Sequence, residues 1–187
     1  MSEYGFKKAI SLEEYASHFN NIDPLSPYKT WTTKQSIPRF DVKSERVKAA
    51  FVVSDPVDWS RDIQVLCDIL RSGGLPGEKS NHQPHMYFAA DDLEYQAVFP
   101  SERLGMGAFR IALESIFNSI HHKPLEYTSF GKPNPFGATQ AGHPWFSILT
   151  RTGVFRGKDN HTDYPANQVV ESVQEAVEYI LQREGYL

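Results

Sequence analysis

The sequence is poor in cysteine, in long apolar runs and in clustered positive charge. Cys67 is its single cysteine among 187 residues, which excludes an internal disulfide and a metal site built from several cysteines. No apolar run approaches the roughly 18 residues of a membrane-spanning helix. With a net charge of -4 and no basic block, the chain gives no electrostatic case for binding nucleic acid or an anionic membrane. We therefore expect no nucleic-acid partner and no membrane span.

Several familiar signatures of targeting and catalysis are also missing. The N-terminal residues 1–19 lack an apolar signal core, and they are too acidic and too poor in arginine for a mitochondrial transit peptide. The seven histidines are scattered without a His-x-x-x-His pair, which disfavours a metal site. No Gly-x-Ser-x-Gly elbow and no Walker loop occurs. The sequence thus predicts no bound metal, no serine-hydrolase elbow and no phosphate-binding loop of the Walker type.

The hydrophobic pattern predicts an α/β fold with a mostly parallel sheet. Near-continuous apolar runs are typical of strands buried on both faces, and apolar residues at helical spacing indicate amphipathic helices. Because the two patterns alternate along the chain, a parallel sheet with helical crossovers is the favoured arrangement. We expect strands over residues 47–54, 86–89, 125–130 and 145–150, and helices over residues 12–19, 56–70, 109–120 and 169–180.

Side chains at the predicted helix ends give further expectations. Ser11 and Glu14 have the spacing of a capping box. Asp55 is a plausible N-cap, with Pro56 at the first helical position of the second helix. We expect Asp58 and Asp62 on a solvated face of that helix. Cys67 falls on its apolar stripe, which favours a core residue over a nucleophile.

The turn Gly131-Lys132-Pro133 contains the strongest single candidate for chemistry. It follows a predicted strand, and ligands of open α/β sheets bind beyond the carboxyl ends of the strands. A lysine fixed there would neutralise the charge of a phosphate group; the alternative is an ordinary surface lysine. Asp92, next to Asp91, also follows a strand, and this pair could hold a cation or a substrate hydroxyl or simply face water.

The order of short motifs resembles the haloacid-dehalogenase (HAD) superfamily, class IIA hydrolases, in the branch of the cat-eye-syndrome critical-region group. Gly-Lys-Pro alone is a weak signal, but the ordered set is specific and covers most of the chain. The matching segments are residues 4–7 (YGFK), 54–59 (SDPVDW), 87–88, 92–93, 103–110 (RLGMGAFR), 131–133 (GKP), 145–149 (WFSIL) and 151–154 (RTGV).

This resemblance implies a Rossmann-like hydrolase core with a C2-type α/β cap, with residues 2–104 as cap and 105–187 as part of the core. The implied chemistry is phosphoryl transfer to an aspartate with the help of Mg²⁺, acting on a small phosphorylated molecule. Lys132 matches the lysine of the third family motif and is the implied catalytic residue. Asp92, Gly105 and Gly131 match the region that grips substrate. The family also implies a mitochondrial setting and a link to glycerophospholipid metabolism.

The chain departs from this pattern where the family keeps its acids. The Asp-x-Asp of the first motif and the Ser or Thr of the second are absent. Residues 137–140 lead directly to residues 141–145, so that a helix, a strand and the magnesium-binding acids of the fourth motif are missing. We therefore interpret the chain as a truncated or degenerate member, N-terminally incomplete in its cap.

Three expectations follow from these departures. The chain should not bind Mg²⁺ and should be catalytically inactive; the alternative is a non-enzymatic binding or interaction module built on the cap. The incomplete core should expose an apolar surface through which the chain self-associates. Without a targeting segment, a cytoplasmic location stands beside the mitochondrial one.

Overall fold

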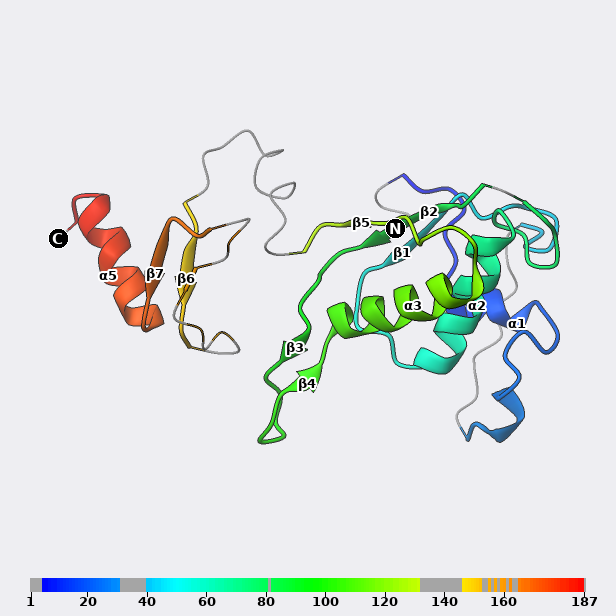
Figure 1. The fold of residues 1–187 in the computed structure, drawn as a ribbon, viewed down its shortest axis with the longest axis horizontal. Coiled ribbons are helices and arrows are strands. Elements are labelled where there is room, and N and C mark those ends of the chain that lie inside the picture. Colours follow the sequence, from blue (N-terminus) through cyan, green and yellow to red (C-terminus); the bar gives the residue numbers. More distant parts are fainter. Residues whose placement is uncertain are drawn as a thin grey trace. The chain divides into compact units, whose positions relative to one another are not determined.

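The computed structural model divides into two units, which are described separately (Figure 1). The first unit is Met1–Tyr87 with Phe109–Thr128, and the second is Phe88–Ala108 with Ser129–Leu187. The structure describes residues 5–30, 40–80, 82–131, 146–152, 155, 157, 159–160, 162 and 165–186.

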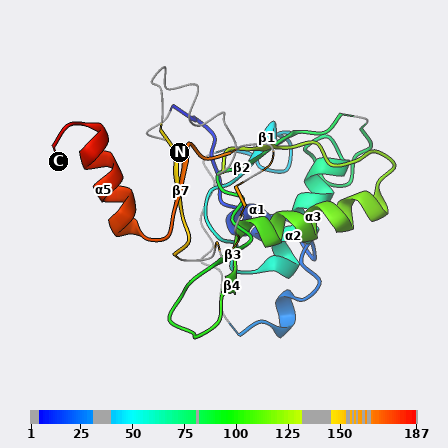
Figure 2. The same ribbon diagram turned by 60° about the vertical axis from the view of Figure 1, so that its left-hand side comes forward.

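A three-stranded sheet with order β1-β2-β5 organises the first unit. In Figures 1 and 2, α2 and α3 lie on the same side of strands β1 and β2. Because α2 follows β1 and α3 follows β2 in the chain, strands and helices alternate, and the predicted α/β fold is confirmed. The elements are α1 (Leu12–Ser17), η2 (Ser26–Tyr28), β1 (Ala49–Val52), α2 (Trp59–Arg71), β2 (His85–Phe88), α3 (Met106–Ile120) and β5 (Thr128–Ser129).

The buried faces of α2 and α3 supply most of the apolar core. Trp59 packs edge-on against Phe109, with ring centroids 5.4 Å apart, and so joins the two helices. Cys67 is only 2 % exposed. Burial, with a smaller contribution from Asp68, raises the pKa of its thiol to about 11. The prediction of a core cysteine is confirmed. The fully or almost fully buried positions of the two helices are Val65, Leu66, Cys67, Ile69, Leu70, Phe109, Leu113 and Phe117.

The first helix begins as its sequence predicts, but the second does not. Ser11 Oγ accepts the backbone N–H of Glu14 at 3.1 Å, so the cap of α1 is confirmed. The prediction of Asp55 as the cap of α2 is wrong, because the helix begins at Trp59 and Asp58 accepts the backbone N–H of Arg61 at 3.3 Å. The indole N–H of Trp59 donates to the carbonyl of Pro56 at 3.0 Å. Residues 55–58 therefore form a turn ahead of the helix.

The sequence Ser72-Gly73-Gly74 predicts a left-handed glycine stop at the end of the second helix, and this prediction is confirmed. Gly73 and Gly74 have φ of 69° and 95°. The N–H of Gly74 donates to the carbonyl of Ile69 at 2.9 Å, the bond that closes a Schellman motif. A Cβ on Gly74 would come within 2.1 Å of the carbonyl oxygen of Val47. Both the backbone angle and the available space therefore require glycine here.

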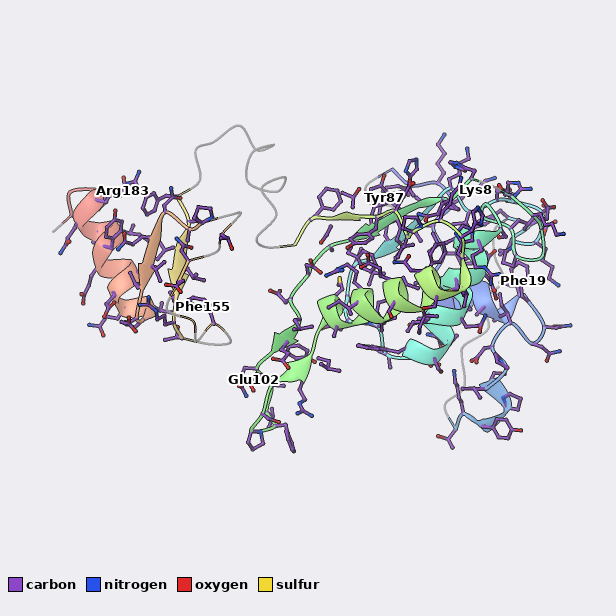
Figure 3. All side chains as sticks on the ribbon, viewed as in Figure 1. Lys8, Phe19, Tyr87, Glu102, Phe155 and Arg183 are labelled. Carbon is purple, nitrogen blue, oxygen red and sulfur yellow. The ribbon has the colours of Figure 1, made fainter. Side chains whose placement is uncertain are left out.

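The second unit holds two small sheets and one helix. A hairpin pairs β3 (Glu94–Tyr95) with β4 (Arg103–Leu104) in antiparallel fashion, and Figure 3 labels Glu102 beside it. Strand β6 (Ile148–Thr150) pairs in parallel with β7 (Gln168–Val170), and α5 (Val173–Arg183) follows. The prediction that Val169 begins the last helix is wrong, since this residue pairs with Leu149 in β7. The hairpin and β7 were not predicted from the sequence.

Aromatic and cationic side chains fasten α5 to the chain beside β6. The rings of Phe146 and Tyr179 stack with centroids 5.6 Å apart. The guanidinium of Arg183, labelled in Figure 3, lies 3.9 Å from the centroid of Phe146.

In the described part of the chain, no helix is long and apolar enough to span a membrane. The assignment of residues 2–104 to a cap and 105–187 to a core stays a prediction.

Candidate functional site

The candidate site is built around Ala90 to Asp92, which begin two residues after the end of β2. The carbonyl of Asp92 accepts the N–H of Gly107 at 2.9 Å, and the carbonyl of Leu93 accepts the N–H of Gly105 at 2.8 Å. These two backbone bonds join the start of α3 to the segment that follows β2.

Three glycines pack directly against this backbone. A Cβ on Gly105 would lie 2.6 Å from the carbonyl oxygen of Asp92, and one on Gly107 would lie 2.4 Å from that of Asp91. A Cβ on Gly131 would come within 2.2 Å of the backbone nitrogen of Asp91. Real Cβ atoms are not found at such distances, so no side chain fits at any of the three positions. Glycine is therefore required at all three positions for the backbones to approach this closely.

Residues that are far apart in sequence meet here. Gly131 follows β5, and the backbone N–H of Phe130 donates to the carbonyl of Phe88 at 2.9 Å. The structure thus brings together Asp92, Gly105 and Gly131, which the sequence singles out as substrate-binding candidates. Gly105 and Gly131 are buried, and the side chain of Asp92 is exposed. Lys132, the predicted catalytic residue, lies outside the described residues, and the roles of all four stay predictions.

The side chains at this edge are acidic. Asp91 is partly buried and Asp92 is exposed, and Glu94 lies on the next strand. Such carboxylates accept hydrogen bonds from substrate hydroxyls, but a phosphate would need a cation beside them. Among the residues that the structure describes, no three His, Cys, Asp or Glu side chains gather as a metal site. The donor set in the described part of this edge does not fit Mg²⁺, and the expectation that the chain binds none stays a prediction.

A buried ionic cluster in the first unit is a feature that the sequence reasoning missed. Lys29 donates to the carboxylates of Asp23 and Asp58, and Arg61 donates to Asp62 at 2.9 Å. Asp58 and Asp62 are each only 7 % exposed, so the prediction that both lie on a solvated face is wrong. The closeness in sequence of Asp58, Arg61 and Asp62 was a signal from which ion pairing could have been predicted. The link to Lys29 could not have been predicted in this way, because 29 residues separate it from Asp58.

Burial and pairing shift the pKa values in this cluster in different directions. Burial alone raises the pKa of Asp58, but hydrogen bonds from Lys29, Ser60 and the N–H of Arg61 outweigh it and hold that pKa below its ordinary value. Burial raises the pKa of Asp62, and the pairing with Arg61 offsets only part of that effect. Burial lowers the pKa of Lys29, but its two carboxylate partners raise it above its ordinary value. Pairing thus favours the charged forms of Asp58 and Lys29, whereas burial disfavours the charged form of Asp62.

Comparison with known proteins finds no matching family model. The chain is 28 % identical to the cardiolipin synthase (CMP-forming) / mitochondrial hydrolase fusion protein of Schizosaccharomyces pombe, over 97 % of this chain and 37 % of that protein. It is also 28 % identical to a mitochondrial hydrolase of Saccharomyces cerevisiae, over 75 % of this chain and 42 % of that protein.

The chain spans about two fifths of the length of each of these relatives. The alignment with the fusion protein covers 224 residues, more than the 187 of this chain, so the relative has residues inside the aligned region without a counterpart here. Both relatives are named as mitochondrial hydrolases, in agreement with the setting that the sequence resemblance implies. Over most of its length, then, this α/β chain is similar to proteins that are named hydrolases.

Proposed function

We propose that this chain is a HAD-like class IIA hydrolase family protein of the phosphatase type that binds a small phosphorylated molecule beside Asp92. One observation carries the proposal: Gly105, Gly107 and Gly131 close onto the backbone of Ala90–Asp92. The last of these glycines immediately precedes Lys132, which is the cation that this acidic edge needs to hold a phosphate. The hydrolase names of the two relatives support the same class.

The substrate class follows from chemistry and from the relatives together. Asp92 would accept hydrogen bonds from hydroxyl groups of the ligand, and Lys132 would pair with its phosphate. A phosphorylated polyol has both groups. One relative is named as a fusion with cardiolipin synthase, which supports a place in glycerophospholipid metabolism and a mitochondrial setting.

We propose further that the chain as written does not hydrolyse its ligand. Phosphoryl transfer through a covalent intermediate needs a carboxylate nucleophile, and losing it removes the pathway. The chain lacks the Asp-x-Asp motif and the acids of the fourth motif. Charge stabilisation by Lys132 alone leaves an anion site without turnover. The aligned residues of the fusion protein that have no counterpart here support an internal loss.

The experiment is hydrolysis of p-nitrophenyl phosphate and of a panel of phosphorylated polyols, with and without Mg²⁺. We expect no magnesium-dependent turnover in the wild type. By calorimetry we expect weak binding of phosphorylated glycerol, which Lys132→Ala reduces and which Lys43→Ala, a change of an exposed lysine of the first unit, leaves unchanged. Magnesium-dependent turnover that disappears in Lys132→Ala would contradict the proposed inactivity.

A second measurement separates true loss from an incomplete sequence. The genomic DNA across residues 137–145 is read for in-frame codons that supply the missing acidic motif. We expect none. Their presence would mean that a longer chain is the enzyme, and the same turnover assay on that longer chain would then be expected to succeed.

A further inference from the structure

Four of the seven histidines gather around two adjoining cavities of the first unit. One cavity, of about 400 Å³, is lined by His82, His85 and His121 among others. The second, of about 420 Å³, is lined by His121 and His122. The two cavities share Ser80 and His121 in their walls. The sequence reasoning treated these histidines as scattered, and the fold brings them together.

The residues that line these cavities all belong to the first unit, whereas the residues of the candidate site belong to the second. The lining residues 80–84 precede the strand, and residues 121–127 connect α3 to β5. The candidate site, in contrast, follows the strand at Ala90–Asp92. A ligand in the larger cavity would therefore occupy a site of its own.

The wall of the larger cavity is held in place by side-chain bonds to backbone. The amide of Gln83 donates to the carbonyl of Glu126 at 2.6 Å and accepts the N–H of the same residue at 3.1 Å. Asn118 Oδ1 accepts the N–H of Leu125 at 2.8 Å. The two chain segments on either side of the cavity are thus joined before any ligand arrives, which lowers the entropy cost of binding.

His121 is held with one ring nitrogen toward the larger cavity's wall. Its Nδ1 contacts the carbonyl oxygen and the N–H of Lys123, at 3.1 and 3.4 Å. Its ring packs against Phe117 and His122, with centroid distances of 4.9 and 4.4 Å. In the tautomer in which Nδ1 accepts the N–H of Lys123, Nε2 carries the proton and can donate a hydrogen bond to a ligand.

Hydrogen-bond donors outnumber carboxylates around the larger cavity. Lys123 and Glu126 balance in formal charge, and the imidazoles of His82, His85 and His121 add N–H groups to the lining. The smaller cavity is balanced, with Arg71 and Lys79 beside Asp68 and Glu78. In the described part of the chain, these histidines form no group that could hold a metal ion. The donors therefore suit an anion rather than a cation.

We propose that the larger cavity is a second anion site, which takes a phosphate-bearing small molecule through Lys123, His82 and His121. A phosphate oxygen accepts hydrogen bonds from ammonium and imidazole N–H groups, and such charge-assisted bonds are the strong ones. A volume of about 400 Å³ is within the range of small-molecule sites, so the ligand extends beyond the phosphate itself.

The test is a titration of pyrophosphate into the Lys132→Ala protein by calorimetry, with the imidazole proton resonances followed by NMR. The Lys132→Ala background removes the anion site of the proposed function, so the two proposals succeed or fail separately. We expect binding, with the resonance of His121 among those that move. The exposed pair His82→Gln/Lys123→Gln should weaken binding about tenfold or more, the equivalent of one charge-assisted hydrogen bond.

The matched control is Lys43→Gln, an exposed lysine that lines neither cavity. It should bind pyrophosphate as the background protein does. A second variant, His121→Gln, should also weaken binding while its thermal unfolding stays that of a folded protein. No pyrophosphate binding, equal binding by the paired variant, or equally tight binding of citrate would each overturn the proposal of a phosphate site.

Discussion

Lys29 Nζ lies 2.6 Å from Asp23 Oδ2, and the same ammonium donates to the carboxylate of Asp58 at the start of α2. The three side chains are only 12, 10 and 6 % exposed. One lysine from the irregular segment after α1 thus bridges two buried acids, one of which caps a helix. This pairing links the segment after α1 to the start of α2, a contact that the sequence did not predict.

Replacing Lys29 should destabilise the first unit strongly. Lys29→Ala leaves two buried carboxylates without their cation, and breaking such a pair costs about 3 kcal/mol. The free energy of unfolding is measured by urea titration. The matched control is Lys8→Ala, which removes the ion pair between Lys8 and Glu45, two side chains that are 55 and 40 % exposed. Its effect should be much smaller, and equal effects of the two variants would contradict a buried role for Lys29.

The pH dependence of stability should differ in sign between Asp58 and Asp62. The pKa of Asp58 is held below its ordinary value of about 3.9, so its contribution is present above that pH and is lost as the pH falls through the folded-state pKa. The pKa of Asp62 is raised by burial, so its ionisation lowers stability as the pH rises. We expect the free energy of unfolding of Asp58→Asn to fall furthest below that of wild type near neutral pH. That of Asp62→Asn should be most favourable relative to wild type at the same pH.

Unfolding curves between pH 3 and pH 8 check this prediction. Towards pH 3 the difference in stability between wild type and Asp58→Asn should begin to narrow, because a contribution that rests on a lowered pKa is lost as the pH falls below the ordinary value of about 3.9. For each variant, the difference in stability from wild type is plotted against pH. If the plots for Asp58→Asn and Asp62→Asn had slopes of the same sign, the opposite pKa directions would be contradicted. On the alkaline side, the raised pKa of Lys29 keeps its contribution present until the pH rises above its ordinary value of about 10.4.

The close approach of Gly131 to Asp91 should make this position intolerant of any side chain. A Cβ would meet the backbone nitrogen of Asp91 at 2.2 Å, so Gly131→Ala must displace backbone. Such overpacking costs about 1–3 kcal/mol. Gly77→Ala is the control: open space surrounds it, and only its φ of 90° resists the substitution, at about 1 kcal/mol. Thermal unfolding that is disturbed more by Gly77→Ala would count against the packing at the candidate site.

Cys67 should be inert in the folded protein. Burial raises the pKa of its thiol to about 11, so only about one thiol in a thousand is ionised at pH 8. Reaction with a chromogenic disulfide reagent at pH 8 should be slow in buffer and rapid in concentrated urea. Fast labelling of the native protein would mean that α2 opens readily or that the thiol is not in the core.

An exposed apolar stripe on α5 should promote self-association. Val173, Val177 and Ile180, spaced four and three residues apart, are 60, 49 and 45 % exposed. Pairing such a face with that of a second copy removes it from water. Sedimentation should reveal a concentration-dependent dimer that Val177→Glu weakens. Glu178→Gln, on the same helix, is the control. A monomer at all concentrations would contradict the prediction.

Local sequence signals predicted much of this fold because the interactions behind them are local. Ser11 caps α1 by reaching a backbone N–H three residues away, and Gly73–Gly74 end α2 through angles that other residues avoid. The apolar stripe that contains Cys67 likewise follows from helix periodicity alone. The same reasoning placed the cap of α2 at Asp55, whereas in the structure Asp58 caps the helix and also pairs with the distant Lys29.

By itself the sequence determined the alternation of strands and helices and the glycines at positions 105, 107 and 131. Apolar periodicity is a pattern among neighbouring residues, and the lack of a Cβ is a property of glycine itself, so neither depends on the tertiary fold. Tertiary structure alone decided what these residues meet. It placed Gly131 against Asp91, buried Asp58 and Asp62 around distant cations, and gathered His82, His85 and His121 at one cavity. Such encounters depend on how the strands are ordered in the sheet, and burial and charge pairing act through distance in space rather than through spacing in the chain.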